Sequence, residues 1–573
     1  MPIIWPGNRH HALVELCLDR HVRLWLAAQR LRKTVRCPLS DINSTSQAKR
    51  GMVPFSSPLA GVKIPRASLR QVVIDSATAR GSHPALIDGQ SGQTMTYAEL
   101  AYNVDRLAAG LATAGLRPGD VLALLSPNTL LYPVVFHAAL AAGATVTTVN
   151  ALATSDDVLR QISDSRARFL VTISALLDRA TAAADRVQEV FVCDDAQGYR
   201  SIRELMASTD PPPQVDIDPV TSLAVLPYSS GTTGATKAVM LTHGNLVANI
   251  VQTQQMVKYV PSDRVLAIVP FFHAYGFTVV MNMALAQGAT LIVLPRFHLA
   301  EFLTAMQDHR VNRAFVAPPI VLALANDPLV DDYELPALDV VVSGAAPLDG
   351  NLAQACAARL GCRVQQGYGM TEMCVSHLQP YEDLRVKPGT VGPLVPNTLA
   401  RVIDVATGED LGVGQSGELW VKGPQVMRGY LGRPADTEAV IDADGWLHTG
   451  DVARVDEDGD WYIVDRVKEL IKYKGYQVPP AELEAVLLGH PRIADAAVVA
   501  GHDACGQEIP HAFVVAVPGA ELTQQDVKNY VAERVAPYKR VRAVTFVNAI
   551  PKTASGKILR KDLRARLSVS LGK

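Results

Sequence analysis

The sequence lacks the cysteine pattern of a disulfide-rich or zinc-binding protein. Its seven cysteines are scattered from position 17 to position 505, and none forms a Cys-x-x-Cys pair. Free cysteines without such spacing are typical of a reducing compartment, so we expect a cytoplasmic protein. The formal net charge is only -2, which gives no indication of nucleic acid or an anionic membrane as a partner.

The sequence also lacks an uninterrupted apolar run of the kind that crosses a bilayer. Two segments carry no charged residue, Val121–Ser155 and Val265–Pro295, and both are long enough to span a membrane. Prolines and polar residues interrupt both of them, for example at Pro133 and Pro270. We therefore predict buried elements of a folded domain here, and no transmembrane segment.

The two charge-free segments resemble each other. VLALL (121–125) matches VLAIV (265–269), and AALAAGATVTTVN (138–150) matches MALAQGATLIVLP (283–295). Each reads as a buried strand, a helix, a glycine turn and a second buried strand. Apolar runs without alternation are typical of parallel strands that are covered on both faces. The match predicts two related α/β subdomains.

The chain of 573 residues is too long for one core, and its composition, 48% hydrophobic and 19% charged, is that of a globular protein. The first 51 residues differ, because nine lysines and arginines stand there against three acids. We predict a disordered or dispensable leader at 1–51, with translation from Met52 as one explanation. A basic amphipathic helix that rests on a membrane or a partner is the alternative.

The stretch YSSGTTGATKAVMLTH (228–243) is rich in glycine and hydroxyl side chains, yet it lacks the spacing of the common phosphate loop, Gly-x₄-Gly-Lys-Ser/Thr. It follows an apolar strand predicted at 223–227 and precedes a helix predicted to begin near His243. Backbone N–H groups and hydroxyls in such a loop bind phosphate oxygens. A polar surface turn would have a similar composition.

Four further motifs carry residues suited to nucleotide chemistry, SGAAPL (343–348), QQGYGMTE (365–372), HTGD (448–451) and PKTASGKILR (551–560). Tyr368 stands between two glycines and offers a flat face to a purine. Glu372 is a candidate Mg²⁺ ligand, and Asp451 could accept hydrogen bonds from both ribose hydroxyls. Each motif taken alone is weak, and a lysine such as Lys557 is more often only solvated.

In this order and spacing the motifs resemble the adenylate-forming superfamily of acyl-CoA synthetases, luciferases and adenylation domains, from about Pro65 to Arg566. The stretch VDRVKELIKYKGYQV (464–478) resembles 4-coumarate–CoA ligases and their bacterial relatives. The phosphate loop departs from the family, which has Pro and Gly where this chain has Thr236 and Ala238. The replacement of Gly by Ala238 matters only if that position needs a positive φ.

The resemblance implies an α/β fold with a large N-terminal AMP-binding domain (52–465), built of two related subdomains and a small distorted barrel. A small mobile α+β lid domain (466–573) would follow it. The implied reaction uses ATP, Mg²⁺ and coenzyme A to convert a carboxylic acid to an acyl adenylate and then to a thioester. An acyl-AMP ligase that serves a carrier protein and a catalytically silent nucleotide-binding scaffold are the alternatives.

The resemblance also assigns roles to individual residues. The predicted catalytic residues are Lys557, His273 and Thr232. The predicted ATP- and AMP-binding residues are Ser229, Ser230, Gly231, Thr232, Thr233, Gly234, Lys237, Gln366, Gly367, Tyr368, Thr371, Asp451 and Arg466. Glu372 is the predicted Mg²⁺ ligand, Lys468 the hinge, and Lys474, Gly475 and Arg296 the coenzyme A contacts. The predicted acyl pocket comprises Tyr275, Val342, Gly344, Ala345, Gly369 and Cys374.

The acyl pocket is where the sequence departs most from plant coumarate ligases. Those enzymes carry a lysine where this chain has Val342, and small residues with a proline where it has Met373, Cys374 and Val375. The loss of a cation removes a partner for a ring hydroxyl, so the predicted pocket floor is apolar. Both cinnamate-like acids without a para-hydroxyl and medium-chain fatty acids fit this description.

Overall fold

The computed structural model describes residues 53–75, 80–229, 236–385, 387–474, 476–503, 507–553 and 556–570. The predicted leader, Met52 and six predicted site residues lie outside these ranges; the six are Ser230, Gly231, Thr232, Thr233, Gly234 and Gly475. Within the described ranges, no helix has both the length and the apolar composition that a bilayer crossing requires.

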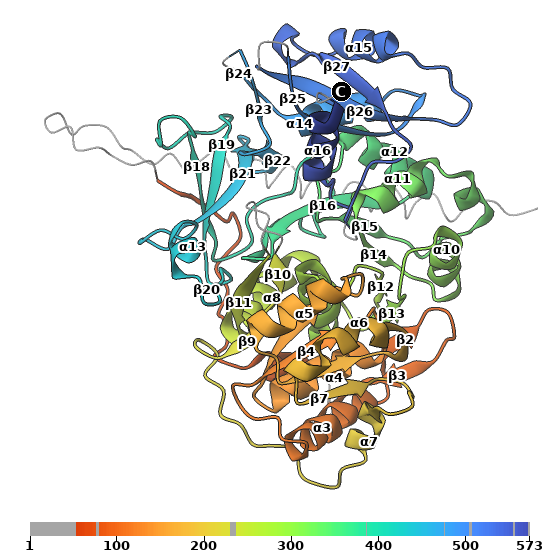
Figure 1. Cartoon of the computed structure of the whole chain (residues 1–573), viewed down its shortest axis with the longest axis vertical. Helices are drawn as coiled ribbons and strands as arrows, with labels where there is room; N and C mark the ends of the chain where they lie inside the picture. The colour runs from red at the N-terminus through yellow and green to blue at the C-terminus, as the bar shows by residue number, and fades with distance from the viewer. Residues whose placement is uncertain are drawn as a thin grey trace, which may run out of the picture. The chain divides into compact units, whose positions relative to one another are not determined.

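The first of two large sheets is mainly parallel and is formed by the segments around the first charge-free run (Figure 1). Its strands in spatial order are β10 (Tyr228–Ser229), β11 (Lys237–Thr242), β9 (Leu223–Val225), β5 (Thr145–Val149), β4 (Val121–Leu125), β6 (Phe169–Thr172), β7 (Glu189–Val192) and β8 (Arg200–Ser201), with β20 (Gly429–Tyr430) paired to β11. The predicted strand at 223–227 is confirmed as β9. The central strands are buried along their whole length, as parallel strands covered on both faces must be.

The second large sheet contains the second charge-free run. Its strands in spatial order are β17 (Cys374–Leu378), β16 (Arg363–Met370), β15 (Val340–Ser343), β14 (Arg313–Val316), β12 (Arg264–Ala267), β13 (Thr290–Val293), β2 (Pro84–Asp88) and β3 (Thr94–Thr96). All of its pairings are parallel except the two outer ones, β16 with β17 and β2 with β3.

The predicted internal repeat is confirmed. In the first copy, β4 and β5 pair in parallel and enclose helix α4 (Leu131–Ala141). In the second copy, β12 and β13 pair in parallel and enclose the π-helix η4 (Tyr275–Asn282) and helix α9 (Met283–Gln287). The matching sequences therefore form the same strand–helix–strand unit in two sheets.

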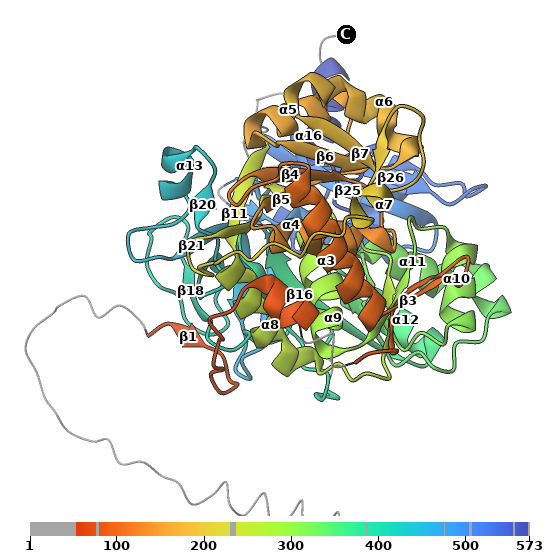
Figure 2. The same ribbon diagram turned by 90° about the horizontal axis from the view of Figure 1, so that it is seen from below.

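Helices fill the space between the two sheets and cover their outer faces, and Figure 2 shows α3 crossing in front of α4. The helices between the sheets are α3 (Tyr97–Thr113), α4, α8 (His243–Val257), η4 and α9. Those on the outer face of the first sheet are α5 (Ser155–Ser165) and α6 (Leu177–Ala180), and those on the outer face of the second are α10 (Leu299–Asp308), α11 (Pro318–Asn326) and α12 (Gly350–Leu360). The predicted helix start near His243 is confirmed, since Thr242 forms a capping box there with Asn245.

An antiparallel sheet and a smaller α+β part follow along the chain. The sheet has the order β1 (Phe55–Ser56), β18 (Leu399–Ile403), β19 (Gly417–Lys422), β21 (Leu447–Val455) and β22 (Trp461–Arg466). It corresponds to the predicted small barrel. Beyond it lie the hairpin β23 (Ile471–Tyr473) and β24 (Tyr476–Val478), the sheet β25 (Ile493–His502), β26 (Glu508–Ala516) and β27 (Ala543–Phe546), and the helices α14 (Pro480–Leu488), α15 (Gln524–Ala532) and α16 (Arg560–Ser570). We call the part from β23 to α16 the lid.

Three histidines are buried in the large domain as neutral rings. Burial lowers the pKa of His137 and His377 to about 3 and the pKa of His243 to about 4. Each ring keeps a hydrogen bond, for example His137 Nε2 with Asn282 Oδ1 at 2.8 Å. In the unfolded chain the same rings titrate near pH 6.5, so between that pH and about pH 4 the unfolded state binds more protons.

We therefore expect the free energy of unfolding to fall as the pH drops from about 6.5 to 4.5. Each histidine contributes about 1.4 kcal/mol per pH unit. The carboxyl of Glu484, whose pKa burial raises to about 7, acts in the opposite direction. His273, whose pKa is also lowered to about 4, adds the same contribution as each of the other three, so the net slope is on the order of 4 kcal/mol per pH unit. Urea midpoints measured across this window test it, and a constant or rising stability toward acid would contradict it.

Candidate functional site

The site lies where parallel strands of the second sheet end. Strands β14, β15 and β16 pair in parallel, so their carboxyl ends meet at one edge, where ligands bind in open α/β sheets. Strand β16 does not end with its neighbours. Its first half, Arg363–Gln366, pairs in parallel with β15, and β17 folds back to pair antiparallel with its second half, Gly367–Met370. The motif QQGYGMTE therefore begins within strand β16 and ends in the turn that follows it.

The change of pairing along β16 requires glycine at position 369. The register shifts between Tyr368 and Gly369, which marks a β-bulge. A Cβ at Gly369 would lie 1.9 Å from the carbonyl oxygen of Cys374 on the facing strand. No side chain fits there, so the close backbone approach depends on glycine.

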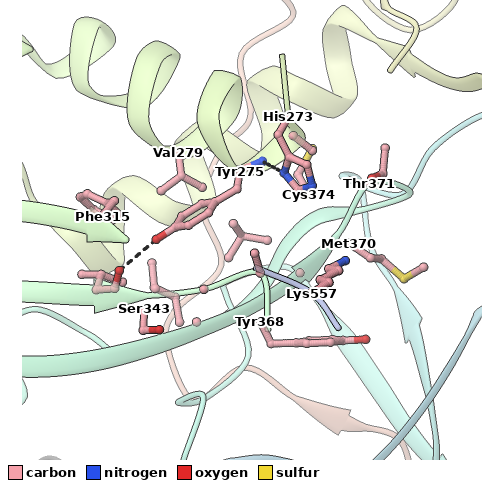
Figure 3. A pocket seen from close by; sticks show the side chains of 18 residues that line it. His273, Tyr275, Val279, Phe315, Ser343, Tyr368, Met370, Thr371, Cys374 and Lys557 are labelled. Atoms are coloured by element: carbon pink, nitrogen blue, oxygen red, sulfur yellow. Dashed lines mark hydrogen bonds between the residues drawn. The ribbon is translucent and has the colours of Figure 1, made fainter. Parts of the chain in front are cut away.

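A pocket opens at this edge, and Figure 3 shows the side chains around it. Eleven of its lining residues were predicted as site residues: His273, Tyr275, Val342, Gly344, Ala345, Gly367, Tyr368, Gly369, Thr371, Cys374 and Lys557. Val375, which the sequence placed at the predicted pocket floor, also lines it, and the residues that the sequence did not single out are Ala274, Val279, Phe315, Ser343, Met370 and Leu378. The wall is thus aliphatic and aromatic, with Lys557 as its one charged side chain among the described lining residues.

The loop before η4 supplies one side of the pocket. The Tyr275 hydroxyl donates to the carbonyl oxygen of Val342 at 3.0 Å, and its ring meets Phe315 edge-on at a centroid distance of 6.3 Å. The Tyr275 N–H donates to Nδ1 of His273 at 3.3 Å, as Figure 3 shows. Burial, with the nearby Lys557 charge, lowers the pKa of His273 to about 4. His273 is therefore neutral at physiological pH, with its proton on Nε2.

The lid brings Lys557 to the pocket on a tight turn. The Thr553 N–H donates to the carbonyl oxygen of Lys557 at 2.8 Å, and the Lys557 N–H donates to the Thr553 hydroxyl at 3.1 Å. Gly556 has a φ of +81°, and a Cβ there would lie 2.9 Å from Pro319 of α11. A glycine at 556 thus lets the turn lie against the large domain and direct Lys557 into the pocket.

The Lys557 ammonium stands among opposing charges. Dense surrounding protein and the positive charge of Arg466 lower its pKa, while the carboxylates of Asp451 and Glu372 oppose that effect. The side chain still reaches solvent through the pocket mouth. A lysine in this position favours a negatively charged group beside it.

A tyrosine, an aspartate and an arginine form a linked set beside the pocket. The Tyr368 hydroxyl donates to Asp451 Oδ2 at 2.6 Å, and Arg466 Nε lies 3.0 Å from Asp451 Oδ1. Strand pairing sets this geometry, because Asp451 on β21 stands opposite Arg466 on β22. Asp451 is buried, and its charge raises the pKa of Arg466. The set can orient polar groups of a ligand that stacks near the Tyr368 ring.

Glu372 is held between two hydroxyl groups. Both Ser229, at 2.9 Å, and Tyr430, at 3.0 Å, donate to its Oε1. The Lys237 ammonium lies over the Tyr430 ring at 4.9 Å and pairs with Asp436 at 3.1 Å. Lys237 is thus already engaged by protein groups, although the sequence predicted a phosphate contact.

The chemistry of the Glu372 site fits Mg²⁺ only together with a ligand that brings further oxygens. Within the described ranges, no three His, Cys, Asp or Glu side chains converge as a ready metal site. Mg²⁺ commonly uses one or two carboxylates and completes its shell with water and substrate phosphates. One buried carboxylate with a neighbouring Ser229 hydroxyl matches that pattern.

The remaining predicted residues lie apart from the pocket. Gln366 is buried opposite Ser343 in the strand pairing, and Lys468, Lys474 and Arg296 are exposed. The Met373 side chain belongs to the core of the antiparallel sheet and does not line the pocket, whereas Cys374 and Val375 do.

The phosphate loop continues into strand β11 at the position where this chain departs from the family. Ala238 lies buried in β11 without a positive φ, so the replacement of the family's Gly by Ala238 costs no backbone strain.

The sequence did not indicate that Tyr430, in the segment GELWVKGPQVMRGYLG (417–432), is a neighbour of Glu372. Its contact with Glu372 spans 58 positions, so no local pattern could reveal it.

Comparison with known proteins gives matches along most of the chain. Residues 74–431 match the AMP-binding enzyme family, and residues 482–557 match the AMP-binding enzyme C-terminal domain. 4-Coumarate–CoA ligase 3 of Oryza sativa subsp. japonica is 40% identical over 540 residues, which cover 92% of this chain and 97% of that protein. The 4-coumarate–CoA ligase of Pinus taeda is 41% identical over 498 residues, covering 85% of this chain and 92% of that protein.

Solved structures show the same arrangement. ATP-bound MatB from Rhodopseudomonas palustris has a TM-score of 0.79 at 29% identity and covers 87% of this chain and 99% of its own. A benzoate CoA ligase from Burkholderia xenovorans LB400 has a TM-score of 0.78 at 27% identity, covering 87% of this chain and 100% of its own.

The fold, the pocket and these matches define an adenylate-forming enzyme. The chain belongs to the AMP-binding enzyme family, as its sequence motifs predicted. The predicted reaction class, an ATP-dependent acid–CoA ligase that forms an acyl adenylate, is confirmed with it.

The close approach at Gly369 generates a prediction for the site. Gly369→Ala forces the backbones of β16 and β17 apart, so we expect the KM for the acid to rise at least about tenfold and the protein to lose on the order of 1–3 kcal/mol of stability. Gly489→Ala is the matched control, since a Cβ there has its nearest neighbour at 3.4 Å. Steady-state kinetics and thermal unfolding of both variants test this, and equal behaviour of the two would contradict it.

Proposed function

We propose that this enzyme activates an apolar, cinnamate-like carboxylic acid and transfers it to coenzyme A. The observation that carries the proposal is the pocket wall of Tyr275, Phe315 and Val342, which offers an aromatic and aliphatic surface. The relatives named 4-coumarate–CoA ligases support a substrate of this shape. A medium-chain fatty acid is the alternative that the same wall could accept.

The wall also limits the polar groups of the substrate. The Tyr275 hydroxyl donates its only proton to the Val342 carbonyl at 3.0 Å, so it has no proton left to donate to an anionic group of the substrate. The Cys374 thiol accepts from Thr278, and burial raises its pKa to about 12, which keeps it neutral. An acid with an ionised group on its far end would therefore lose solvation without gaining a partner.

In the first half-reaction, a carboxylate oxygen of the acid attacks the α-phosphorus of ATP, and the bond to pyrophosphate breaks. Lys557 stabilises the negative charge that gathers on the phosphoryl oxygens, as preorganised charges do in such reactions. Tyr368, Asp451 and Arg466 orient the nucleoside. Neutral His273 adds no competing charge beside Lys557.

In the second half-reaction, the thiol of coenzyme A attacks the carbonyl carbon of the acyl adenylate, and AMP leaves. Lys474 and Arg296 are exposed and remain our candidates for contacts with coenzyme A. Glu372 and Ser229 would hold Mg²⁺ together with the ATP phosphates. The metal would neutralise phosphate charge, which is its usual role in such sites.

The experiment that tests the function measures coenzyme A thioester formation with ATP and a panel of acids: cinnamate, 4-coumarate, and medium- and long-chain fatty acids. We expect kcat/KM to be highest for cinnamate. Val342→Lys should reduce the use of every apolar acid, because a buried ammonium without a partner costs several kcal/mol.

The panel also gives the outcomes that contradict the proposal. A preference for fatty acids would contradict the aromatic substrate. If the activity does not respond to coenzyme A but rises with a carrier protein, the proposal that coenzyme A is the acyl acceptor is wrong. If Val342→Lys uses every acid of the panel with the same kcat/KM as the unmodified enzyme, the acyl pocket lies elsewhere.

Lys557→Ala should separate the two half-reactions. Without its charge we expect acid-dependent ATP–pyrophosphate exchange to fall at least ~100-fold. Thioester formation from supplied acyl adenylate and coenzyme A should persist near the unmodified rate. A loss of both activities to the same extent would contradict the role of Lys557 in adenylate formation alone.

A further inference from the structure

The first helix of the lid, α14, has no side-chain cap within its own N-terminal segment. Pro479 occupies the cap position, and Pro480, the first helical residue, has no N–H to donate. The first available donor is the Ala481 N–H, which lies 2.8 Å from Asp465 Oδ2. A residue outside the helix therefore supplies the cap.

Asp465 belongs to the large domain. It lies on β22 and stands opposite Val452 of β21 in the antiparallel sheet. Its other carboxylate oxygen accepts from the Arg466 N–H at 2.7 Å, which fixes the side chain on the strand. The predicted hinge, Lys468, lies between Asp465 and α14. The bond to Ala481 thus joins two sides of the hinge, and a large rotation of the lid must break it.

A positive charge near the Lys557 turn also acts on this carboxylate. Burial raises the pKa of Asp465, and the charge of Arg560 is the largest influence that opposes this rise. Arg560 also pairs with Glu484 of α14 at 2.9 Å. Arg560 follows Lys557 by three residues, so α14 contacts both Asp465 of the large domain and the segment that carries Lys557.

We propose that Asp465 is a positioning residue that holds the lid in the arrangement in which Lys557 enters the pocket. It does so by capping α14 across the hinge and by attracting Arg560. This inference rests on the proposed function, because it assigns the arrangement to adenylate formation. The proposal assigns the second half-reaction to another lid position, in which this bond is absent.

The test compares Asp465→Ala with two other variants. Asp465→Asn keeps an oxygen that can accept from Ala481 and loses only the charge. Thr523→Ala removes a cap of the same kind from α15, whose partner Asp526 lies within the lid. All three variants are assayed for acid-dependent pyrophosphate exchange and for thioester formation from supplied acyl adenylate.

We expect Asp465→Ala to lower pyrophosphate exchange about five- to tenfold, the usual effect of one lost cap, with thioester formation unchanged or faster. The rate of pyrophosphate exchange of Asp465→Asn should lie between the rates of Asp465→Ala and the unmodified enzyme. Thr523→Ala should lower the Tm without changing the ratio of the two activities. Equal losses in both half-reactions of Asp465→Ala, or the same ratio shift in Thr523→Ala, would overturn the proposal.

Hydrogen–deuterium exchange supplies a readout that needs no substrate. In Asp465→Ala, peptides that cover Ala317–Pro319 and the turn at Gly556 should exchange faster, because their contact depends on the lid position. Unchanged protection there would also overturn the proposal. If the unmodified enzyme activates no acid, the proposed function fails, while this measurement still decides the role of Asp465.

Discussion

The change of pairing along β16 is the constraint on which the rest of the site depends. A strand that ended with its neighbours would leave Tyr368 in a loop. Because β16 continues and β17 folds back against it, Tyr368 reaches Asp451 of the antiparallel sheet, and Glu372, in the turn between β16 and β17, reaches Ser229 of the first large sheet. This pair of strands thus connects three sheets, and Gly369 allows the close backbone contact between them.

Charge around the pocket is arranged for an anionic ligand. Lys557 and Arg466 lie near each other, and their mutual repulsion is one reason why the pKa of Lys557 is lowered. Asp451 and Glu372 offset part of this repulsion. His273 remains neutral because burial and Lys557 both disfavour its protonation. Phosphate groups that enter the site would relieve the repulsion between Lys557 and Arg466. The same electrostatic attraction would then favour phosphate binding and stabilise the negative charge that develops on the phosphate oxygens.

Local sequence could predict the repeated α/β units, because buried parallel strands and their glycine turns leave a pattern that needs no knowledge of distant residues. It also predicted Tyr368, Asp451 and Lys557, through motifs that resemble a family. It could not predict that Lys237 pairs with Asp436, or that Met373 belongs to a different core than Cys374. Those outcomes depend on contacts between segments far apart in the chain, and Met373 lies in the turn that precedes β17, whereas Cys374 begins the strand.

The lid is joined to the large domain by polar and local contacts and not by a shared core. Among the described residues, the apolar clusters of the lid contain only residues from Ile471 onward, and those of the large domain end at Ile463. A large apolar interface would make each rotation of the lid costly, since apolar burial is worth about 25 cal/mol per Å². A few contacts such as those of Asp465 and Gly556 hold the arrangement that places Lys557, and under the proposed mechanism they can break without the loss of a large apolar interface. If the proposed role of Asp465 holds, the small number of such contacts is the physical reason why one residue near the predicted hinge can favour one half-reaction over the other.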